Sequence, residues 1–160
     1  MSAVVLGVGN AFRRDDGIGP ALAEILGERG LPDVTVLSSD GDPGFLLDAW
    51  AGAGLAIVVD ALWCENPVPG RIHRIAETGI WPQAGQASTH GLGIAETVKL
   101  GQALGRMPGR LVIYGVEAED DGFGPGLSAA VTAALPGLAE AVLAELAAAQ
   151  DAAAATGCAD

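Results

Sequence analysis

Short apolar runs alternate along the chain with longer segments that carry apolar residues at helical spacing. The short runs are typical of β-strands, and the longer segments are typical of amphipathic helices. We expect strands at 4–8, 34–37, 55–60, 71–75 and 111–116, and helices at 18–29, 45–51, 88–104 and 128–149. This alternation predicts a three-layer α/β sandwich in which helices cover both faces of a mostly parallel central sheet of about five strands.

Two of the expected strands differ in their surroundings. Residues 55–60 form an unbroken apolar run that ends in Asp60, which is typical of a central strand buried on both faces. The segment 71–75 mixes polar and apolar residues and follows Pro67 and Pro69, so we expect it to be an antiparallel edge strand with one face in solvent.

The boundaries of the last two helices follow from their caps and composition. Ser88 and Thr89 are residue types that cap helices, so we expect one of them to begin the third helix. The final helix is expected to end near Ala149, because the alanine-rich segment after it offers no packing pattern. We therefore predict a single domain at 1–149 and a disordered tail at 150–160.

The first strand leads through Gly7 and Gly9 to a pair of carboxylates, Asp15 and Asp16, at the start of the first helix. Ligand sites in such sheets form at the carboxyl ends of the strands, so this turn is the first candidate site. A dinucleotide-binding turn would need a glycine where Phe12 stands, and the carboxylates would repel a phosphate, so nucleotide binding is the weakest hypothesis. We expect one of the two carboxylates to be the N-cap of the helix.

Three side chains with metal-binding chemistry are expected at the same rim of the sheet. Asp16 follows the first strand, Asp60 closes the third, and His90 opens a helix. Two carboxylates and one imidazole suit Ni²⁺, Zn²⁺ or Mn²⁺ and leave coordination positions open. Each residue also has an ordinary explanation, because aspartates end turns and a histidine at a helix start is often a surface residue.

Charge, apolar runs and cysteine spacing exclude several kinds of partner and bond. The 160 residues carry 20 acidic and 8 basic side chains, a formal net charge of −12, which argues against a nucleic-acid partner. We expect no membrane partner and a cytoplasmic location, because the sequence shows neither a run of about twenty apolar residues nor a basic, signal-like N-terminus. Cys64 and Cys158 form no Cys-x-x-Cys pair, and no apolar seam lies outside the expected core, so we expect a monomer without disulfides.

Several short motifs, in chain order, resemble those of the hydrogenase maturation endopeptidases. The resemblance spans nearly the whole chain from Val4 to the last helix. The motifs that carry it are Gly7 Val8 Gly9 Asn10, Asp15 Asp16 Gly17 Ile18 Gly19, Asp40 Gly41, Val59 Asp60 Ala61, Ser88 Thr89 His90 Gly91, and Gly115 Val116 Glu117.

The resemblance implies an enzyme that removes a short C-terminal extension from the large-subunit precursor of a nickel-iron hydrogenase after nickel insertion. It also implies that Asp16, Asp60 and His90 contact the nickel, and that Asp40 belongs to the functional residues. On this interpretation the nickel is carried by the substrate, and the protease recognises it by adding ligands.

The catalytic step stays open at this point. A water oriented by the nickel is the favoured nucleophile, and Asp16 or Asp40 could act as a general base for it. No serine or cysteine with a histidine partner is evident, so a non-catalytic nickel-recognition or chaperone protein is the alternative hypothesis.

Overall fold

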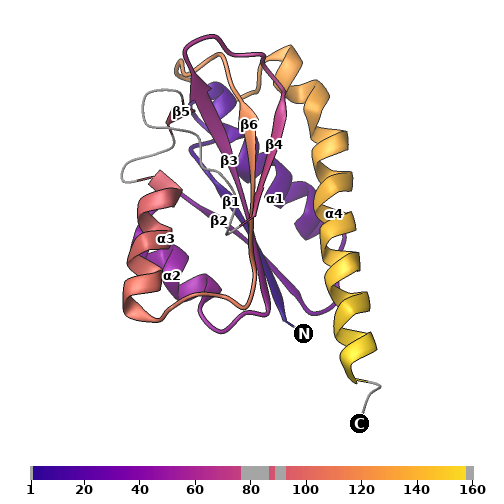
Figure 1. Ribbon diagram of the computed structural model, residues 1–160. Coiled ribbons are helices and arrows are strands. Elements are labelled where there is room, and N and C mark those ends of the chain that lie inside the picture. Colours follow the sequence, from indigo (N-terminus) through magenta and orange to yellow (C-terminus); the bar gives the residue numbers. More distant parts are fainter. Residues whose placement is uncertain (1, 77–86, 89–92, 158–160) are drawn as a thin grey trace.

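The computed structural model describes residues 2–76, 87–88 and 93–157 (Figure 1). The helices and strands in chain order are β1 (Ala3–Val8), the 3₁₀-helix η1 (Arg14–Gly17), α1 (Ile18–Glu28), β2 (Val34–Ser39), α2 (Pro43–Trp50), β3 (Leu55–Cys64), β4 (Ile72–Ala76), β5 (Ala87–Ser88), α3 (Gly93–Leu104), β6 (Leu111–Glu117) and α4 (Ala129–Gly157).

The main sheet has the strand order β2-β1-β3-β6-β4. The first four strands of this order run parallel, and β4 runs antiparallel to β6 at the edge, as the sequence pattern predicted. The predicted fold class is therefore confirmed. Because β2 and β3 lie on opposite sides of β1, the strand order reverses at β1, and such a switch point is where open α/β sheets bind ligands.

Helices cover both faces of the sheet (Figure 1). The face with α1 and α4 buries Val5, Ile57 and Val59 of the strands against Leu22 and Leu26 of α1 and Val142 of α4. The opposite face, with α2 and α3, buries Leu6, Val58 and Ile113 against Leu47, Trp50 and Val98. Alternate residues of each strand enter opposite cores, so β1 and β3 are apolar throughout, which explains their unbroken hydrophobic runs.

Glycines allow α1 to start directly against the sheet. A Cβ at Gly7 would overlap the carbonyl of Gly19, and a Cβ at Gly19 would overlap the backbone of Val8 and lie 2.6 Å from the carbonyl oxygen of Val59. A Cβ at Gly9, whose φ is +142°, would overlap the carbonyl of Asp16. The glycine-rich turn thus serves backbone packing between β1, β3 and the first helical turn.

The third helix begins later than the sequence predicted. Ser88 lies in β5, where it pairs with Trp63 of β3, and α3 begins at Gly93, so the prediction that Ser88 caps this helix was wrong. Thr89 lies outside the described residues. A short antiparallel pairing with β3 outweighed the capping signal, because cap residues such as Ser are also common in strands and turns.

The final helix is longer than predicted. It runs to Gly157 rather than ending near Ala149, because alanine has the highest helix propensity and needs no packing partner. The structure therefore extends the helix through most of the predicted tail, while 158–160 lie outside the described residues.

By length and composition α4 could cross a membrane, which the sequence analysis did not anticipate. Its buried residues Val131, Leu138, Val142 and Leu146 instead pack into the core on the α1 face. The core helices of globular proteins share this length and composition.

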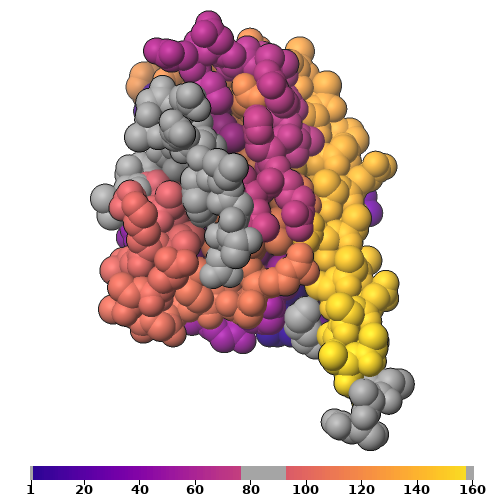
Figure 2. All heavy atoms as spheres, viewed as in Figure 1, coloured from indigo at the N-terminus to yellow at the C-terminus, as the bar shows by residue number. Residues whose placement is uncertain are grey.

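Glu145 ties α4 to the edge of the sheet. Its carboxylate accepts two hydrogen bonds from Arg74 of β4, at 2.8 and 2.9 Å, one from Arg110 at 3.2 Å and one from the Tyr114 hydroxyl at 2.8 Å. Figure 2 shows α4 running down one side of the molecule, with its upper part beside the segment of β4. The hydrogen bonds from Arg74 lower the pKa of Glu145, and burial together with Glu145 raises the pKa of Tyr114 to about 12.

Replacing Glu145 should lower the free energy of unfolding by an amount that depends on pH. Its pKa is lower in the folded chain than in the unfolded one, so its stabilisation is present above the unfolded value and is lost as pH falls through the folded pKa. We expect Glu145→Gln to lower the free energy of unfolding by about 1–2 kcal/mol at neutral pH. Urea unfolding of both proteins from pH 3 to 8 should show this difference shrinking below the ordinary value of 4.5. A constant difference would contradict the assignment.

The close packing of Gly19 predicts that two glycines of α1, Gly19 and Gly27, respond differently to substitution by alanine. Gly19→Ala forces a Cβ into the backbone of Val8, so we expect a loss of about 3 kcal/mol or more. Gly27→Ala, eight residues further along α1, meets nothing within 4 Å and should add about 0.5–1 kcal/mol through helix propensity. Thermal unfolding measures both, and similar melting temperatures for the two variants would refute the close contact.

Candidate active site at the strand switch point

Asp16 is buried at the carboxyl end of β1. It lies in η1, only 2% of it is exposed, and its Oδ2 accepts a hydrogen bond from the backbone N–H of Asn10 at 2.9 Å. The backbone carbonyl of Asp16 packs so closely against Gly9 that a Cβ on Gly9 would overlap it. Backbone contacts on both sides therefore fix the position of this carboxylate.

Asp60 is buried in β3, with 1% of its surface exposed. Its Oδ1 accepts a hydrogen bond from the N–H of Ala61 at 2.8 Å. The alternation of the strand puts its side chain on the face that also receives Val58, which is covered by α2 and α3. Because η1 contacts β3 and Gly19 touches the carbonyl of Val59, the first turn of α1 brings the segment of Asp16 to the level of Asp60.

Asp40 lies at the same edge of the sheet but in a different environment. It directly follows β2, whose last residue Ser39 accepts a hydrogen bond from the N–H of Gly9 at 2.9 Å. Asp40 is exposed, and its Oδ1 accepts the N–H of Asp42 at 3.1 Å. Asp42 in turn caps α2 by accepting the N–H of Phe45 at 2.9 Å. This turn therefore lies beside the glycine turn that follows β1 and leads to Asp16.

His90 lies outside the described residues, so its predicted place beside Asp16 and Asp60 stays a prediction. The chain before it is anchored at β5, which pairs with the end of β3, and α3 begins three residues after it. Among the residues that the structure describes, no three histidine, cysteine, aspartate or glutamate side chains form a group that could hold a metal ion.

Asp15 has a role that the sequence analysis missed. We expected Asp15 or Asp16 to cap α1, but the N-cap is Gly17 and no side chain caps this helix. The fully buried Asp15 carboxylate instead accepts four hydrogen bonds, from the N–H of Glu119 at 3.1 Å, the N–H of Asp120 at 3.1 Å, and the N–H and hydroxyl of Ser128 at 2.6 and 2.9 Å. It holds both ends of the loop between β6 and α4.

The same loop is joined to the β1–α1 turn by further bonds. The N–H of Gly124 donates to the carbonyl of Phe12 at 2.7 Å, and the N–H of Arg14 donates to the carbonyl of Gly124 at 3.1 Å. The Arg14 guanidinium also bonds Asp120 at 3.2 Å and the Pro125 carbonyl at 2.9 Å. These contacts hold Arg14 at a φ of +51°, an uncommon conformation for a residue with a side chain. The turn that carries Asp16 is therefore stiff.

A further buried carboxylate, Glu117, lies at the end of β6. Glu117 accepts hydrogen bonds from His73 at 2.8 Å and from the Val68 N–H at 3.1 Å, and it forms an ion pair with Arg71 at 2.7 Å. Burial raises its pKa, but these partners outweigh burial, so the pKa of Glu117 is lowered. Burial and the nearby Glu117 raise the pKa of the Cys64 thiol, which therefore favours its neutral, less nucleophilic form.

The site that these elements define is a pair of buried carboxylates, Asp16 and Asp60, at the switch point of a parallel sheet. Carboxylates in such a place can hold a cation or exchange a proton with a bound substrate. The exposed turn of Asp40 borders the same edge. This arrangement defines an α/β protein with an acidic site at the carboxyl ends of its strands.

Comparison with known proteins identifies the family. The model of the HycI hydrogenase maturation proteases matches residues 20–145. The chain is 31% identical over 149 residues to the hydrogenase 2 maturation protease of Escherichia coli, and the match covers 91% of each chain. The chain belongs to the hydrogenase maturation protease family.

Solved structures agree with this assignment. The hydrogenase maturating endopeptidase HybD of E. coli is 29% identical, with a TM-score of 0.71 over 91% of this chain and 92% of that one. The maturation protease HybD of Thermococcus kodakarensis shares the fold at 24% identity, with a TM-score of 0.74 over 91% of this chain and 99% of that one. The resemblance stated from the motifs is confirmed, and the chain is a peptidase, which favours the protease hypothesis over the recognition-protein and nucleotide-binding alternatives.

Loss of the Asp15 charge should loosen the loop between β6 and α4. An asparagine would turn an amide towards backbone donors, so we expect Asp15→Asn to lower the free energy of unfolding by about 2–4 kcal/mol. Hydrogen exchange should rise at the N–H groups of Glu119, Asp120 and Ser128. Asp121→Asn, which changes an exposed carboxylate of the same loop, is the control and should change neither quantity. Unchanged protection in Asp15→Asn would contradict this role.

Proposed function

We propose that this peptidase removes the C-terminal extension of a nickel-iron hydrogenase large-subunit precursor after nickel has been inserted. The observation that supports the proposal most directly is the pair of buried carboxylates, Asp16 and Asp60, at the switch point of a chain that belongs to the maturation protease family. The relatives are named for hydrogenase maturation, and we extend that role to the present chain by proposing the precursor as its substrate.

In this proposal the nickel ion is part of the substrate. Asp16 and Asp60, together with His90, add ligands to the nickel of the precursor. Imidazole and carboxylate are suitable ligands for this borderline ion. The interaction exists only when the precursor is loaded, so it selects loaded over empty precursor by a difference in binding free energy. Burial of the two carboxylates strengthens their attraction to a cation, because little water competes or screens there.

Cleavage requires a water molecule that attacks the scissile carbonyl. We propose that the nickel orients this water and that Asp16 or Asp40 accepts its proton. The two candidates differ in environment, because Asp16 is buried and fixed by Asn10 whereas Asp40 is exposed and closes a turn with Asp42. A monomeric enzyme in the cytoplasm, without nucleic-acid or membrane partners, completes the proposal.

The experiment is mass spectrometry of a large-subunit precursor, loaded with nickel or empty, after incubation with the protein. We expect loss of a short C-terminal peptide from the loaded precursor only. Asp16→Asn, Asp60→Asn and His90→Ala should each slow this cleavage by about 100-fold or more, and Asp151→Asn, at the exposed end of α4, should cleave normally. The Asp40→Asn variant tests the general base. Slow cleavage with normal binding of loaded precursor assigns the base to Asp40, and normal cleavage leaves Asp16 as the remaining candidate.

Two outcomes would overturn the proposal. Equal cleavage of loaded and empty precursor would remove the role of nickel. A stable, nickel-promoted complex without shortening of the precursor would make the protein a recognition factor instead.

A further inference from the structure

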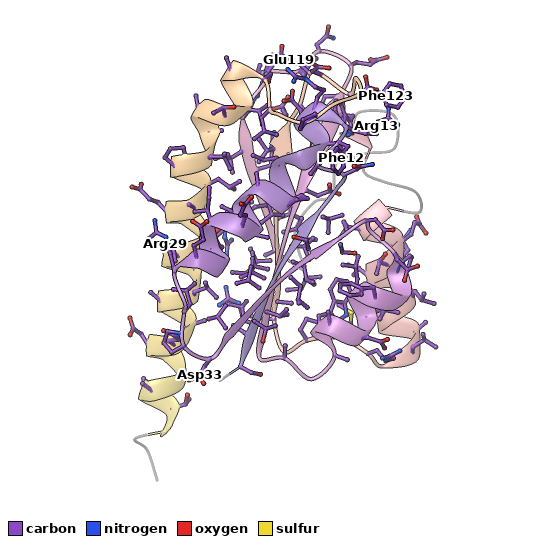
Figure 3. All side chains as sticks on the ribbon, turned by 180° about the vertical axis from the view of Figure 1, so that it is seen from behind. Phe12, Arg13, Arg29, Asp33, Glu119 and Phe123 are labelled. Atoms are coloured by element: carbon purple, nitrogen blue, oxygen red, sulfur yellow. The ribbon has the colours of Figure 1, made fainter. Side chains whose placement is uncertain are left out.

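All three phenylalanines of the chain are on the surface. Phe12 is 70% exposed, Phe45 41% and Phe123 89%. Phe12 and Phe123 belong to different loops, yet Figure 3 shows both at the same end of the molecule, beside Arg13. We call Phe12, Arg13 and Phe123 the aromatic rim.

The aromatic rim is held in place by hydrogen bonds. The N–H of Phe12 donates to the Asn10 side chain at 2.9 Å, and the carbonyl of Phe12 accepts the N–H of Gly124, the neighbour of Phe123. The Arg13 guanidinium lies 5.1 Å from the centre of the Phe123 ring and donates to the Asp121 carbonyl at 3.0 Å. Both loops are also fastened to the buried Asp15. The rings are thus presented on a rigid support.

The two rings contribute little to the fold. Neither Phe12 nor Phe123 belongs to a core, whereas burying a phenylalanine would stabilise the chain by about 1.5–3 kcal/mol. Aromatic and arginine side chains that are exposed and preorganised are the residue types that dominate binding at protein interfaces. Their placement indicates a surface that is completed by another molecule.

We propose that the aromatic rim is the docking surface for the folded body of the precursor, outside the segment that enters the active site. The proposal rests on the proposed function, and it adds the surface through which the substrate is recognised. Phe12 and Asp16 belong to the same turn, only four residues apart, so a protein that contacts the rim lies beside the candidate catalytic carboxylate.

The charges around the rim define the partner surface. Glu119 and Asp121 are exposed next to the rim, and the chain as a whole carries a net charge of −12. The rings require an apolar patch, and the adjoining carboxylates favour lysine or arginine at its border. A second copy of this acidic chain would meet like charges at the same place, which disfavours self-association through the rim.

The test compares two double variants of the full chain. Phe12→Ala/Phe123→Ala truncates the rim, and Leu100→Ala/Leu104→Ala truncates two exposed side chains of α3 as a matched control, with exposures of 42% and 57%. Binding of nickel-free precursor is measured by biolayer interferometry, and cleavage of loaded precursor is measured as KM and kcat. Melting temperatures of both variants should match the unaltered protein, because the truncated side chains are exposed.

We expect the rim variant to raise Kd and KM about 10-fold or more with kcat within about 2-fold, and the α3 variant to leave all three unchanged. Unchanged Kd and KM in the rim variant would overturn the proposal that the aromatic rim is the docking surface. If the same variant cleaves loaded precursor normally, the proposed function still stands. If the unaltered protein binds the precursor through the rim but does not shorten it, the proposed function fails and the docking surface stands.

Absence of any binding to the precursor would overturn both. Sedimentation of the free protein tests whether the aromatic rim instead binds a second copy of this chain. A dimer that the rim variant abolishes, with no change in precursor Kd, would make the rim an interface between copies of this chain and would overturn the proposal.

Discussion

The structure depends on one close backbone contact, between the first turn of α1 and the strands β1 and β3. Gly7, Gly9 and Gly19 leave no side chain between these elements, so the peptide groups themselves are in contact. Any side chain there would push α1 away from the sheet and carry Asp16 with it. The carboxylate of Asp16 therefore owes its burial to glycines that have no chemistry of their own, and this contact takes the place of the phosphate cradle that a glycine-rich turn forms in nucleotide-binding proteins.

Around this contact the end of the molecule that carries the candidate site is assembled from segments far apart in sequence. Asp15 binds the loop that follows β6, more than a hundred residues further along the chain. The adjacent aspartates thus have different surroundings, because Asp15 accepts four hydrogen bonds from the loop while Asp16 lies in η1, which contacts β3, the strand of Asp60. Glu145 performs a comparable structural task at the β4 edge of the sheet, where it joins α4 to β4 and β6.

The order of the elements and the place of Asp16 after the first strand were accessible from sequence, because apolar periodicity is a local signal. Asp60 was expected to end its strand, but β3 continues to Cys64, and the burial of the two carboxylates was not predicted. The antiparallel edge strand was accessible from the same local signal. The role of Asp15 was not, since its partners are backbone N–H groups from a distant loop, which no sequence pattern reveals. The pairing of Ser88 with Trp63 was also missed, because a two-residue strand has no periodicity and a serine suits both a cap and a strand.

The loop between β6 and α4 is fastened at two points, Asp120 and Ser128, by the single carboxylate of Asp15. The span between these anchors is fixed, while side chains at its tip, such as that of Phe123, project into solvent. Natural selection can therefore exchange tip residues without disturbing the framework, in the way that antibody loops vary on a constant scaffold. A substitution at this tip would change the surface that the loop offers to a partner, while the buried carboxylates keep their positions.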